Sequence, residues 1–231
     1  MSRTVTLSDI HYQSRLRADK VGSTYIKKDE LTSYINSSYA ELYDLLVGAY
    51  GNDYYLKLYT FATSNGVDEY SLPADFYKLI GIDFKITASR RLTLRPFQFN
   101  ERNRYQEGAY WSAVVGISGP RYHLQADKIK FRPKPDGNYD IDFWYIPACP
   151  ILVNDADTVD GVNGWEEYIF VDCAIKMLSK EESDVSHLEI QKQRLIQRIN
   201  TMAENRDAGQ TFRVSDVQKD WLNIEGDTYR Y

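Results

Sequence analysis

The chain has 231 residues, of which 43% are hydrophobic, with a net charge of −5 at pH 7 and two cysteines. This length suits one large or two small globular domains with a real core. The negative charge argues against a sequence-independent nucleic-acid binder, the cysteines provide no disulfide framework, and no apolar run reaches the length of a signal peptide core or a membrane span.

Two helices are predicted in the N-terminal segment. Thr6 is a helix cap with Asp9 three residues later, which predicts a short helix ending between Asp19 and Ser23. A second helix is predicted over Lys28–Ala49, because leucine and isoleucine recur there at helical spacing and Gly51 follows.

From Tyr54 the apolar period changes to two, which is typical of strands. Asn65-Gly66 is a tight-turn signal and predicts a hairpin whose second strand is Val67–Leu72. A short helical turn over Pro73–Phe76 and a strand over Lys78–Ile86 are expected to follow.

A small helix over Pro96–Glu107 is expected to lie on the sheet surface. After it, alternating residues and turn signals predict a three-stranded meander. Its strands are Arg121–Gln125, Lys128–Arg132 and Tyr139–Tyr145. A long connection over Pro147–Gly164 leads from the meander to the next helix.

Two more helices are predicted near the C-terminus. A helix is predicted over Trp165–Glu182. Its segment Trp165–Leu178 is apolar almost all round, and only Asp172 and Lys176 interrupt it after Glu167, which is typical of the centre of a helical bundle. The next helix is capped by Asp184 or Ser186 and ends near 207–209. Its expected apolar positions are Leu188, Leu195, Ile199 and Met202.

This order of elements predicts an α+β fold, with a helical bundle formed by the N- and C-terminal helices, an inserted antiparallel β-module and an extended C-terminal tail. We expect the N-terminal helices of the bundle in 1–53 and the β-module in 54–147. The C-terminal helical hairpin is expected in 148–209 and the tail in 210–231.

The tail carries large apolar side chains without a clear period, which favours docking onto a neighbouring molecule. Its candidate interface residues are Phe212, Val214, Val217, Trp221, Leu222, Tyr229 and Tyr231. We expect Phe212, Trp221 and Leu222 to be the anchors, because buried aromatic and apolar side chains dominate interface energies.

The motifs for chemistry are weak. The segment 154–161 resembles a calcium loop, but counted from Asp155 the fifth and sixth positions are Val159 and Asp160, where the loop needs an oxygen ligand and a glycine. Asp140 and Asp142 point the same way on a strand, and the solvent face of a sheet is their expected position. We therefore expect no enzyme, no metal and no cofactor.

The three histidines, His11, His123 and His187, lie at no metal-ligand spacing. Arg90, Arg91, Arg102 and Arg104 are expected in solvated turns, although a local basic patch is the alternative.

An aromatic cluster leaves a second function open. Its members are Tyr54, Tyr55, Tyr59, Tyr105, Tyr110 and Trp111. Such rings can form a stacking platform for sugars or single-stranded nucleic acid, or they can pack on a neighbouring subunit. The negative net charge disfavours nucleic acid, so the alternative is a carbohydrate-binding or tail-associated module that uses the tyrosine-rich β-region.

Two pairs of segments resemble a known family. The helix Ile35–Leu46 and the following Tyr70–Leu79, with its Leu-Pro-Ala-Asp-Phe turn, resemble the opening of the head-to-tail adaptor, or connector, proteins of tailed bacteriophages. The segments Gly164–Val185 and Asn205–Ala208 are similar to the paired helices that close them.

The resemblance implies a structural protein of the virion neck, made in the host cytoplasm and not bound to a membrane. It implies that the subunit docks beneath the portal protein as a ring of twelve copies and provides an attachment surface for tail or nozzle proteins. Genomic DNA would pass through the channel of this ring without sequence-specific binding.

Overall fold

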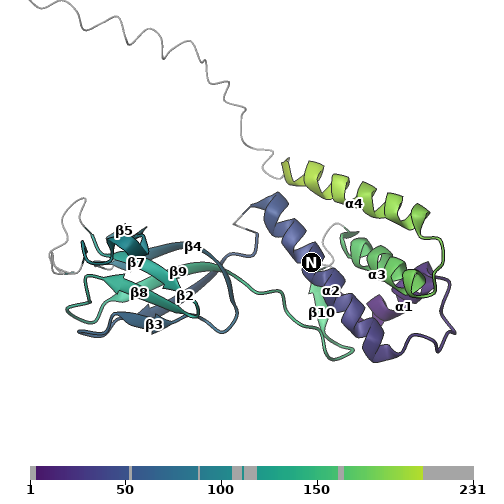
Figure 1. The fold of residues 1–231 in the computed structure, drawn as a ribbon, viewed down its shortest axis with the longest axis horizontal. Coiled ribbons are helices and arrows are strands. Elements are labelled where there is room, and N and C mark those ends of the chain that lie inside the picture. The colour runs from purple at the N-terminus through teal and green to yellow at the C-terminus, as the bar shows by residue number, and fades with distance from the viewer. Residues whose placement is uncertain are drawn as a thin grey trace, which may run out of the picture.

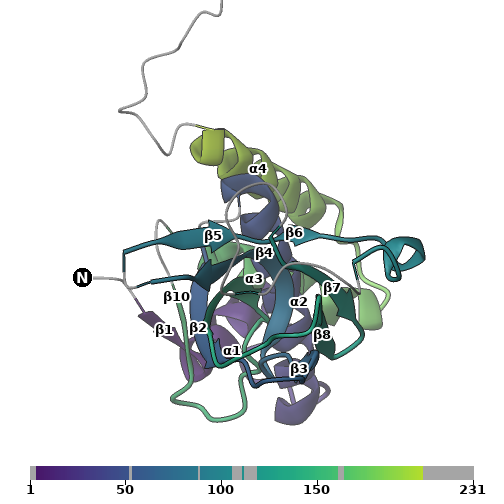
Figure 2. The ribbon, with the colours of Figure 1, turned by 90° about the vertical axis from the view of Figure 1, so that its left-hand side faces the viewer.

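The computed structural model describes residues 4–51, 54–87, 89–105, 111, 119–160 and 164–204. Figure 1 shows a helical part and a β part side by side along the longest axis, and Figure 2 looks along that axis from the β side. The helices come from both ends of the described chain, and the β part lies between them in the sequence. The expected α+β class with antiparallel sheets is confirmed.

The helical part contains the four α-helices of the described residues. They are α1 (Leu7–Arg17), α2 (Lys28–Tyr50), α3 (Glu166–Lys180) and α4 (Ser186–Glu204). Helix α1 begins as predicted, because the Asp9 N–H donates to the Thr6 hydroxyl and the Thr6 N–H donates to the Asp9 carboxylate. Helix α2 ends at Gly51, which has a φ of 76° that other residues rarely adopt.

All four helices contribute to one apolar core. Its fully buried members include Leu7, Ile10, Leu31, Ile35, Ile169, Val171, Cys173 and Ala174. Met202, expected on the inner side of α4, is 50% exposed. Helices α3 and α4 form an antiparallel hairpin in which Lys192 lies opposite Asp172. Met202 is further along α4 and therefore lies beyond Glu166, the first residue of α3, where α3 does not cover it.

A short two-stranded β-ribbon connects the start of α1 with the segment that precedes α3. Strand β1 (Thr4–Thr6) pairs antiparallel with β10 (Thr158–Asp160), and the Leu7 N–H donates to the Asp157 carbonyl at 2.8 Å. The sequence predicts no strand at either position, because three residues are too few to show a period. The segment expected to be a long connection is therefore fixed against the start of α1.

The β part is a sandwich of two four-stranded sheets. One has the order β2-β9-β4-β5 and contains β2 (Lys57–Ala62), β9 (Asp140–Pro147), β4 (Phe76–Lys85) and β5 (Arg91–Thr93). The other has the order β3-β8-β7-β6 and contains β3 (Glu69–Ser71), β8 (Lys128–Arg132), β7 (Arg121–Gln125) and β6 (Arg95–Pro96). Only β6 and β7 pair in parallel among the described strands. The sheets share a core in which Trp111, Phe131 and Phe143 are fully buried.

The predicted hairpin across Asn65-Gly66 is wrong. Gly66 has the positive φ of a tight turn, 76°, but β2 pairs with β9 and β3 pairs with β8. The turn therefore carries the chain from one sheet to the other. Phe61 and Tyr70 meet across the sandwich with ring centroids 5.3 Å apart, so burial of aromatic rings between the sheets favours this arrangement over local pairing.

The predicted meander is correct for its first two strands only. Strands β7 and β8 pair antiparallel, whereas β9 lies between β2 and β4 in the opposite sheet. Ile141 and Phe143 of β9 are fully buried, because a strand at the centre of that sheet places these side chains in the core of the sandwich. The turn at 135–138 therefore joins the two sheets.

The small helix and the short helical turn expected in the β part are both reduced to turns in the described residues. In the segment 96–107, of which 106 and 107 lie outside those residues, the structure has only the 3-10 turn η1 (Phe99–Glu101), closed by reciprocal bonds between Gln98 and Glu101. At Pro73 the chain makes a simple turn in which the Phe76 N–H donates to the Pro73 carbonyl at 3.0 Å.

No helix in the described part of the chain is long and apolar enough to cross a membrane.

Aromatic contacts attach the sandwich to α2. Tyr43 and Val47 of α2 pack with Ile146 of β9, and the Tyr43 hydroxyl donates to the Pro147 carbonyl at 2.6 Å. Tyr55 stacks on Tyr43 with ring centroids 4.3 Å apart. The two parts are therefore held together by side-chain packing as well as by the connecting chain.

Candidate functional site

The predicted interface residues of the tail lie outside the described residues. They are Phe212, Val214, Val217, Trp221, Leu222, Tyr229 and Tyr231. The last described element before them is α4, which ends at Glu204. Candidate surfaces can therefore be built from α4, from the segments beside α2 and from the sandwich.

A charged cluster around the buried Asp172 fixes α4 against α2 and α3. The Asp172 carboxylate, 4% exposed, lies 2.7 Å from the Lys176 Nζ and 2.6 Å from the Lys192 Nζ. The Ser38 hydroxyl donates to the same carboxylate at 2.6 Å. Glu41 lies 3.0 Å from Lys176 and 3.2 Å from Lys192. Three helices thus share one cluster of two cations and two carboxylates, which connects α2, α3 and α4.

The members of this cluster are charged in the folded protein. Burial alone would raise the pKa of Asp172, but hydrogen bonds from Lys176, Lys192 and Ser38 outweigh it and hold that pKa below its usual value. Burial would lower the pKa of both lysines, yet their contacts with Asp172 raise it. Burial raises the pKa of the adjacent Tyr168 to about 12, so its phenol stays protonated. The cluster is therefore structural, and the sequence reveals only the four-residue spacing of Asp172 and Lys176.

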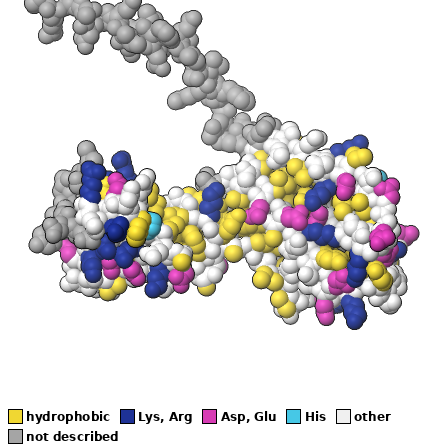
Figure 3. Space-filling model, viewed as in Figure 1, with side chains coloured by type: hydrophobic (Ala, Val, Ile, Leu, Met, Phe, Trp, Pro, Cys, Tyr) yellow, Lys and Arg dark blue, Asp and Glu magenta, His cyan; other side chains and the backbone are white. Residues whose placement is uncertain are grey.

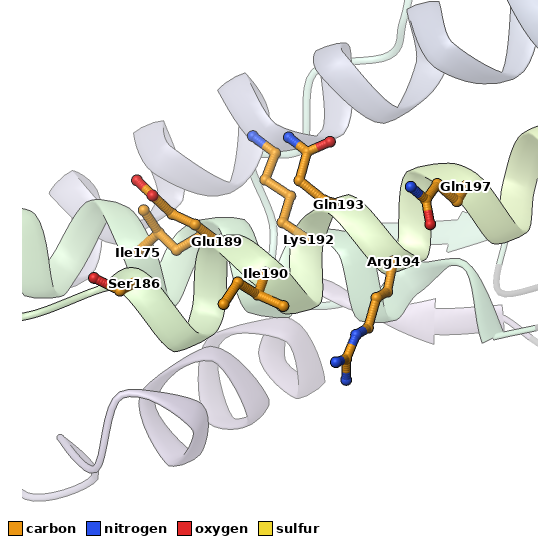
Figure 4. Close-up of a pocket in the computed structure, with 8 residues that line it drawn as sticks. All are labelled: Ile175, Ser186, Glu189, Ile190, Lys192, Gln193, Arg194 and Gln197. Atoms are coloured by element: carbon orange, nitrogen blue, oxygen red, sulfur yellow. The ribbon is translucent and has the colours of Figure 1, made fainter.

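A surface groove of about 850 Å³ follows α4. Its lining, shown in Figure 4, consists of Ile175, Ser186, Glu189, Ile190, Lys192, Gln193, Arg194 and Gln197. Ile190 is 56% exposed, and Arg194 points away from Lys192 in this view. The lining mixes apolar, amide and charged groups without a histidine or a cysteine, so it suits contact with a protein surface rather than bond-making chemistry.

A second candidate surface is the loop 151–153 beside α2. Ile151 and Val153 are 76% and 71% exposed, whereas Leu152 between them is 3% exposed. The Asn36 amide donates to the Leu152 carbonyl at 2.9 Å, and its Oδ1 accepts from the Leu152 N–H at 2.8 Å. The Asp157 carboxylate accepts from the Val153 N–H at 2.7 Å. Two apolar side chains are therefore held outward by hydrogen bonds, and their alternation with Leu152 was the only signal in the sequence.

The calcium-like segment holds its acids for other purposes. Asp155 lies 2.6 Å from the Lys28 Nζ, and Asp157 accepts hydrogen bonds from two backbone N–H groups. Within the described ranges, no group of three or more His, Cys, Asp or Glu side chains could hold a metal ion.

The strand acids do not form a reactive pair. Asp140 is exposed, but Asp142 is fully buried, 2.9 Å from the Lys85 Nζ, and it accepts from the Thr60 hydroxyl at 2.8 Å. The expected solvent position of Asp142 is therefore wrong, because side chains of the neighbouring strands cover it. Burial also raises the pKa of both cysteine thiols, Cys149 and Cys173, to about 12, so neither is a ready nucleophile.

The aromatic side chains expected to form a platform lie in separate environments. Trp111 is fully buried between the sheets, where its Nε1–H donates to the Pro133 carbonyl at 3.0 Å. Tyr54 and Tyr55 contact each other at the junction with α2, and Tyr59 lies beside Phe61 on β2. Tyr105 packs near Phe97, and Tyr110 lies outside the described residues. The described rings therefore do not offer one stacking surface.

Comparison with known proteins identifies the family. The model of a family described as SU10 adaptor protein matches residues 6–216, from the cap of α1 through both sheets and α4 into the predicted tail. No curated protein matches the chain. Because this match covers far more than half of the sequence, the chain belongs to the SU10 adaptor protein family, a family of structural proteins of bacteriophages, as its resemblance to head-to-tail adaptors implies.

Proposed function

We propose that the protein is a head-to-tail adaptor of a virion, which docks beneath the portal as a ring of copies, extends the DNA channel and provides the attachment surface for the tail. The observation that carries this proposal is the family match over residues 6–216, which includes the helical part and the sandwich together. The pairing of Asp172 and Asp142 with lysines inside the fold supports a structural rather than a catalytic use of the polar groups.

Four segments divide the work in this proposal. Residues 1–53 and 148–209 supply the helices of a bundle that builds the ring, 54–147 form the inserted β-module, and 210–231 form an extended tail. The cluster around Asp172 supports a rigid ring-building unit, because it ties α2, α3 and α4 together.

The tail contacts the portal or the adjacent subunit, with Phe212, Trp221 and Leu222 as anchors. Val214, Val217, Tyr229 and Tyr231 complete this interface. Large apolar side chains supply most of the binding energy when a partner covers them. Of the seven residues, only Phe212 and Val214 lie within the part of the chain that the family model matches.

The partners are the portal protein, neighbouring copies of the chain in a ring of twelve, and tail or nozzle proteins. Genomic DNA passes through the channel without sequence-specific binding, and the protein is located in the neck after synthesis in the host cytoplasm. The carbohydrate-binding alternative loses its support, because the described rings on which it depended are dispersed over the fold.

Gold-conjugated antibody against the chain tests the location. On intact particles, the label should lie at the junction of capsid and tail. A label spread over the capsid surface or along the tail would contradict an adaptor.

A further inference from the structure

The sheet β3-β8-β7-β6 has an outer face that is rich in cations, although the chain as a whole is acidic. Arg95 of β6 is the register partner of Arg121 of β7, and Arg121 is the register partner of Arg132 of β8. Lys128 and Lys130 follow at alternate positions of β8. These five residues are called the basic face below.

The five cations share one side of the sheet because register partners point to the same side and residues two apart do so as well. Ile129 and Phe131, which alternate with the β8 cations, are buried in the core of the sandwich. The cations therefore point away from the core. Figure 3 shows dark blue side chains on the β part, with magenta side chains between several of them.

Among the described residues, carboxylates pair with the three members of the basic face on β8, which are Lys128, Lys130 and Arg132, and the Arg132 side chain is only 13% exposed. Glu69 of β3 lies 2.7 Å from the Lys130 Nζ and 3.8 Å from that of Lys128, and Asp68 pairs with Arg132.

Arg95 and Arg121 have no acidic partner among the described residues. Like charges directly opposite on neighbouring strands destabilise a sheet, so this arginine row is costly unless an anion lies over it.

Aromatic rings border the arginine row. The Arg121 guanidinium lies 4.6 Å from the centroid of the Tyr105 ring, and the Arg102 guanidinium lies 4.6 Å from that of Phe99. Phe99 is 56% exposed. Guanidinium groups held against rings, beside an exposed ring, are the combination that binds phosphates and stacks bases in nucleic-acid surfaces.

We propose that the basic face binds nucleic acid through its phosphate backbone, without reading the sequence. Neighbouring strands lie about 4.8 Å apart, so Arg95 and Arg121 place two cations about 5 Å apart. The lysines of β8 lie beside them, and such a spread of cations matches a linear array of charges better than a single carboxylate. The net charge of −5 gave no indication of this surface, because the cations lie together on one sheet while most Asp and Glu residues lie elsewhere in the chain. The proposal goes beyond the adaptor function, which requires only that DNA passes the ring.

Fluorescence anisotropy with the full chain and a labelled DNA duplex of random sequence tests the proposal. If the basic face makes about four phosphate contacts, the affinity of the chain for the duplex should fall roughly 100-fold when salt rises from about 50 to about 200 mM. R95Q/R121Q removes two of these contacts. It should bind more than roughly tenfold weaker at low salt, and its affinity should fall only about tenfold over the same range.

A matched variant separates local from overall charge. K27Q/R194Q removes two charges from exposed positions of the helical part and should keep wild-type affinity. Circular dichroism establishes that both variants fold. K128Q, at a side chain that is 51% exposed, is the second test within the basic face and should reduce the salt dependence by about one contact.

Two results would overturn the proposal: no binding of the duplex by the wild type at low salt, or equal weakening in K27Q/R194Q. If the wild type ignores DNA but associates with itself in a salt-dependent way that R95Q/R121Q abolishes, the face is a protein contact instead. No portal is present in this experiment, so its failure leaves the adaptor function untouched.

Discussion

Asp172 illustrates at the scale of single residues how a charge is kept inside a helical core. Its carboxylate is 4% exposed, and it faces lysines from its own helix and from α4. Buried ion pairs add little net stability when complete, but removing one partner leaves a buried charge without compensation. The geometry therefore predicts a large effect for a small chemical change.

Asp172→Asn should destabilise the protein by about 3 kcal/mol, the lower end of the range for broken buried pairs, because Glu41 still faces both lysines. Urea unfolding at neutral pH measures the change. The control is Asp155→Asn, which breaks the ion pair between Asp155 and Lys28. Because these side chains are 54% and 60% exposed, the loss of unfolding free energy should be less than about 1 kcal/mol. Equal losses in the two variants would show that the cluster is not a structural unit.

The pH dependence follows from the lowered pKa of Asp172. The unfolded chain binds a proton to this carboxyl at a higher pH than the folded chain does, so the stabilisation is complete above the ordinary pKa of about 4 and is lost as pH falls through the folded value. The difference in unfolding free energy between wild type and D172N should therefore shrink below about pH 4. A difference that stays constant down to pH 2 would contradict this origin.

At the scale of elements, the loop 151–153 depends on one side chain of α2. Asn36 makes two hydrogen bonds to the Leu152 backbone and so holds Ile151 and Val153 outward. A loop fixed in this way loses little conformational entropy when a partner covers it. Its rigidity is therefore a property that can be tested apart from binding.

Asn36→Ala should cost about 1–3 kcal/mol, because two hydrogen bonds to the backbone are lost. Hydrogen exchange of the Leu152 amide should become faster, since its acceptor is removed. Asn200→Ala, at an exposed position of α4, carries the same gain in helix propensity and should leave that amide unchanged. Unaltered Leu152 exchange in N36A would mean that the loop is held by other contacts.

The sequence predicts elements better than it predicts their partners. The capping pair of Thr6 and Asp9 and the period of Lys28–Tyr50 are local signals, so α1 and α2 were predicted closely. The pairing of β2 with β9 instead joins segments about 80 residues apart. The alternation of apolar and polar residues in either strand does not indicate which strand it will pair with. Asn65-Gly66 forms its turn, but the buried rings of the two sheets decide where the chain goes next.

The candidate surfaces were predicted less well than the fold. Asp172 and Lys176 were visible as charges on one face, yet Lys192 and Glu41 complete their cluster from other helices. The basic face depends on the register of three strands, which only the fold supplies.

For the whole molecule, we propose that the residues before 210 fold on their own and that the tail 210–231 binds a partner. A chain that ends at Gly209 keeps every described residue, so it should unfold at the wild-type temperature while losing its binding to the portal. Sedimentation with the portal measures the loss. In the full chain, the triple variant F212A/W221A/L222A should remain folded and lose binding as well. A truncated chain that fails to fold would show that the tail belongs to the body.

The proposed assembly of the protein as a ring on the portal can be measured by light scattering. The molar mass of the purified chain should be measured alone and after mixing with the portal from the same particle. We predict a stable complex that carries many copies of the chain per portal, close to twelve. If the chain keeps the mass of a monomer and does not bind the portal, the protein is not a ring-forming adaptor.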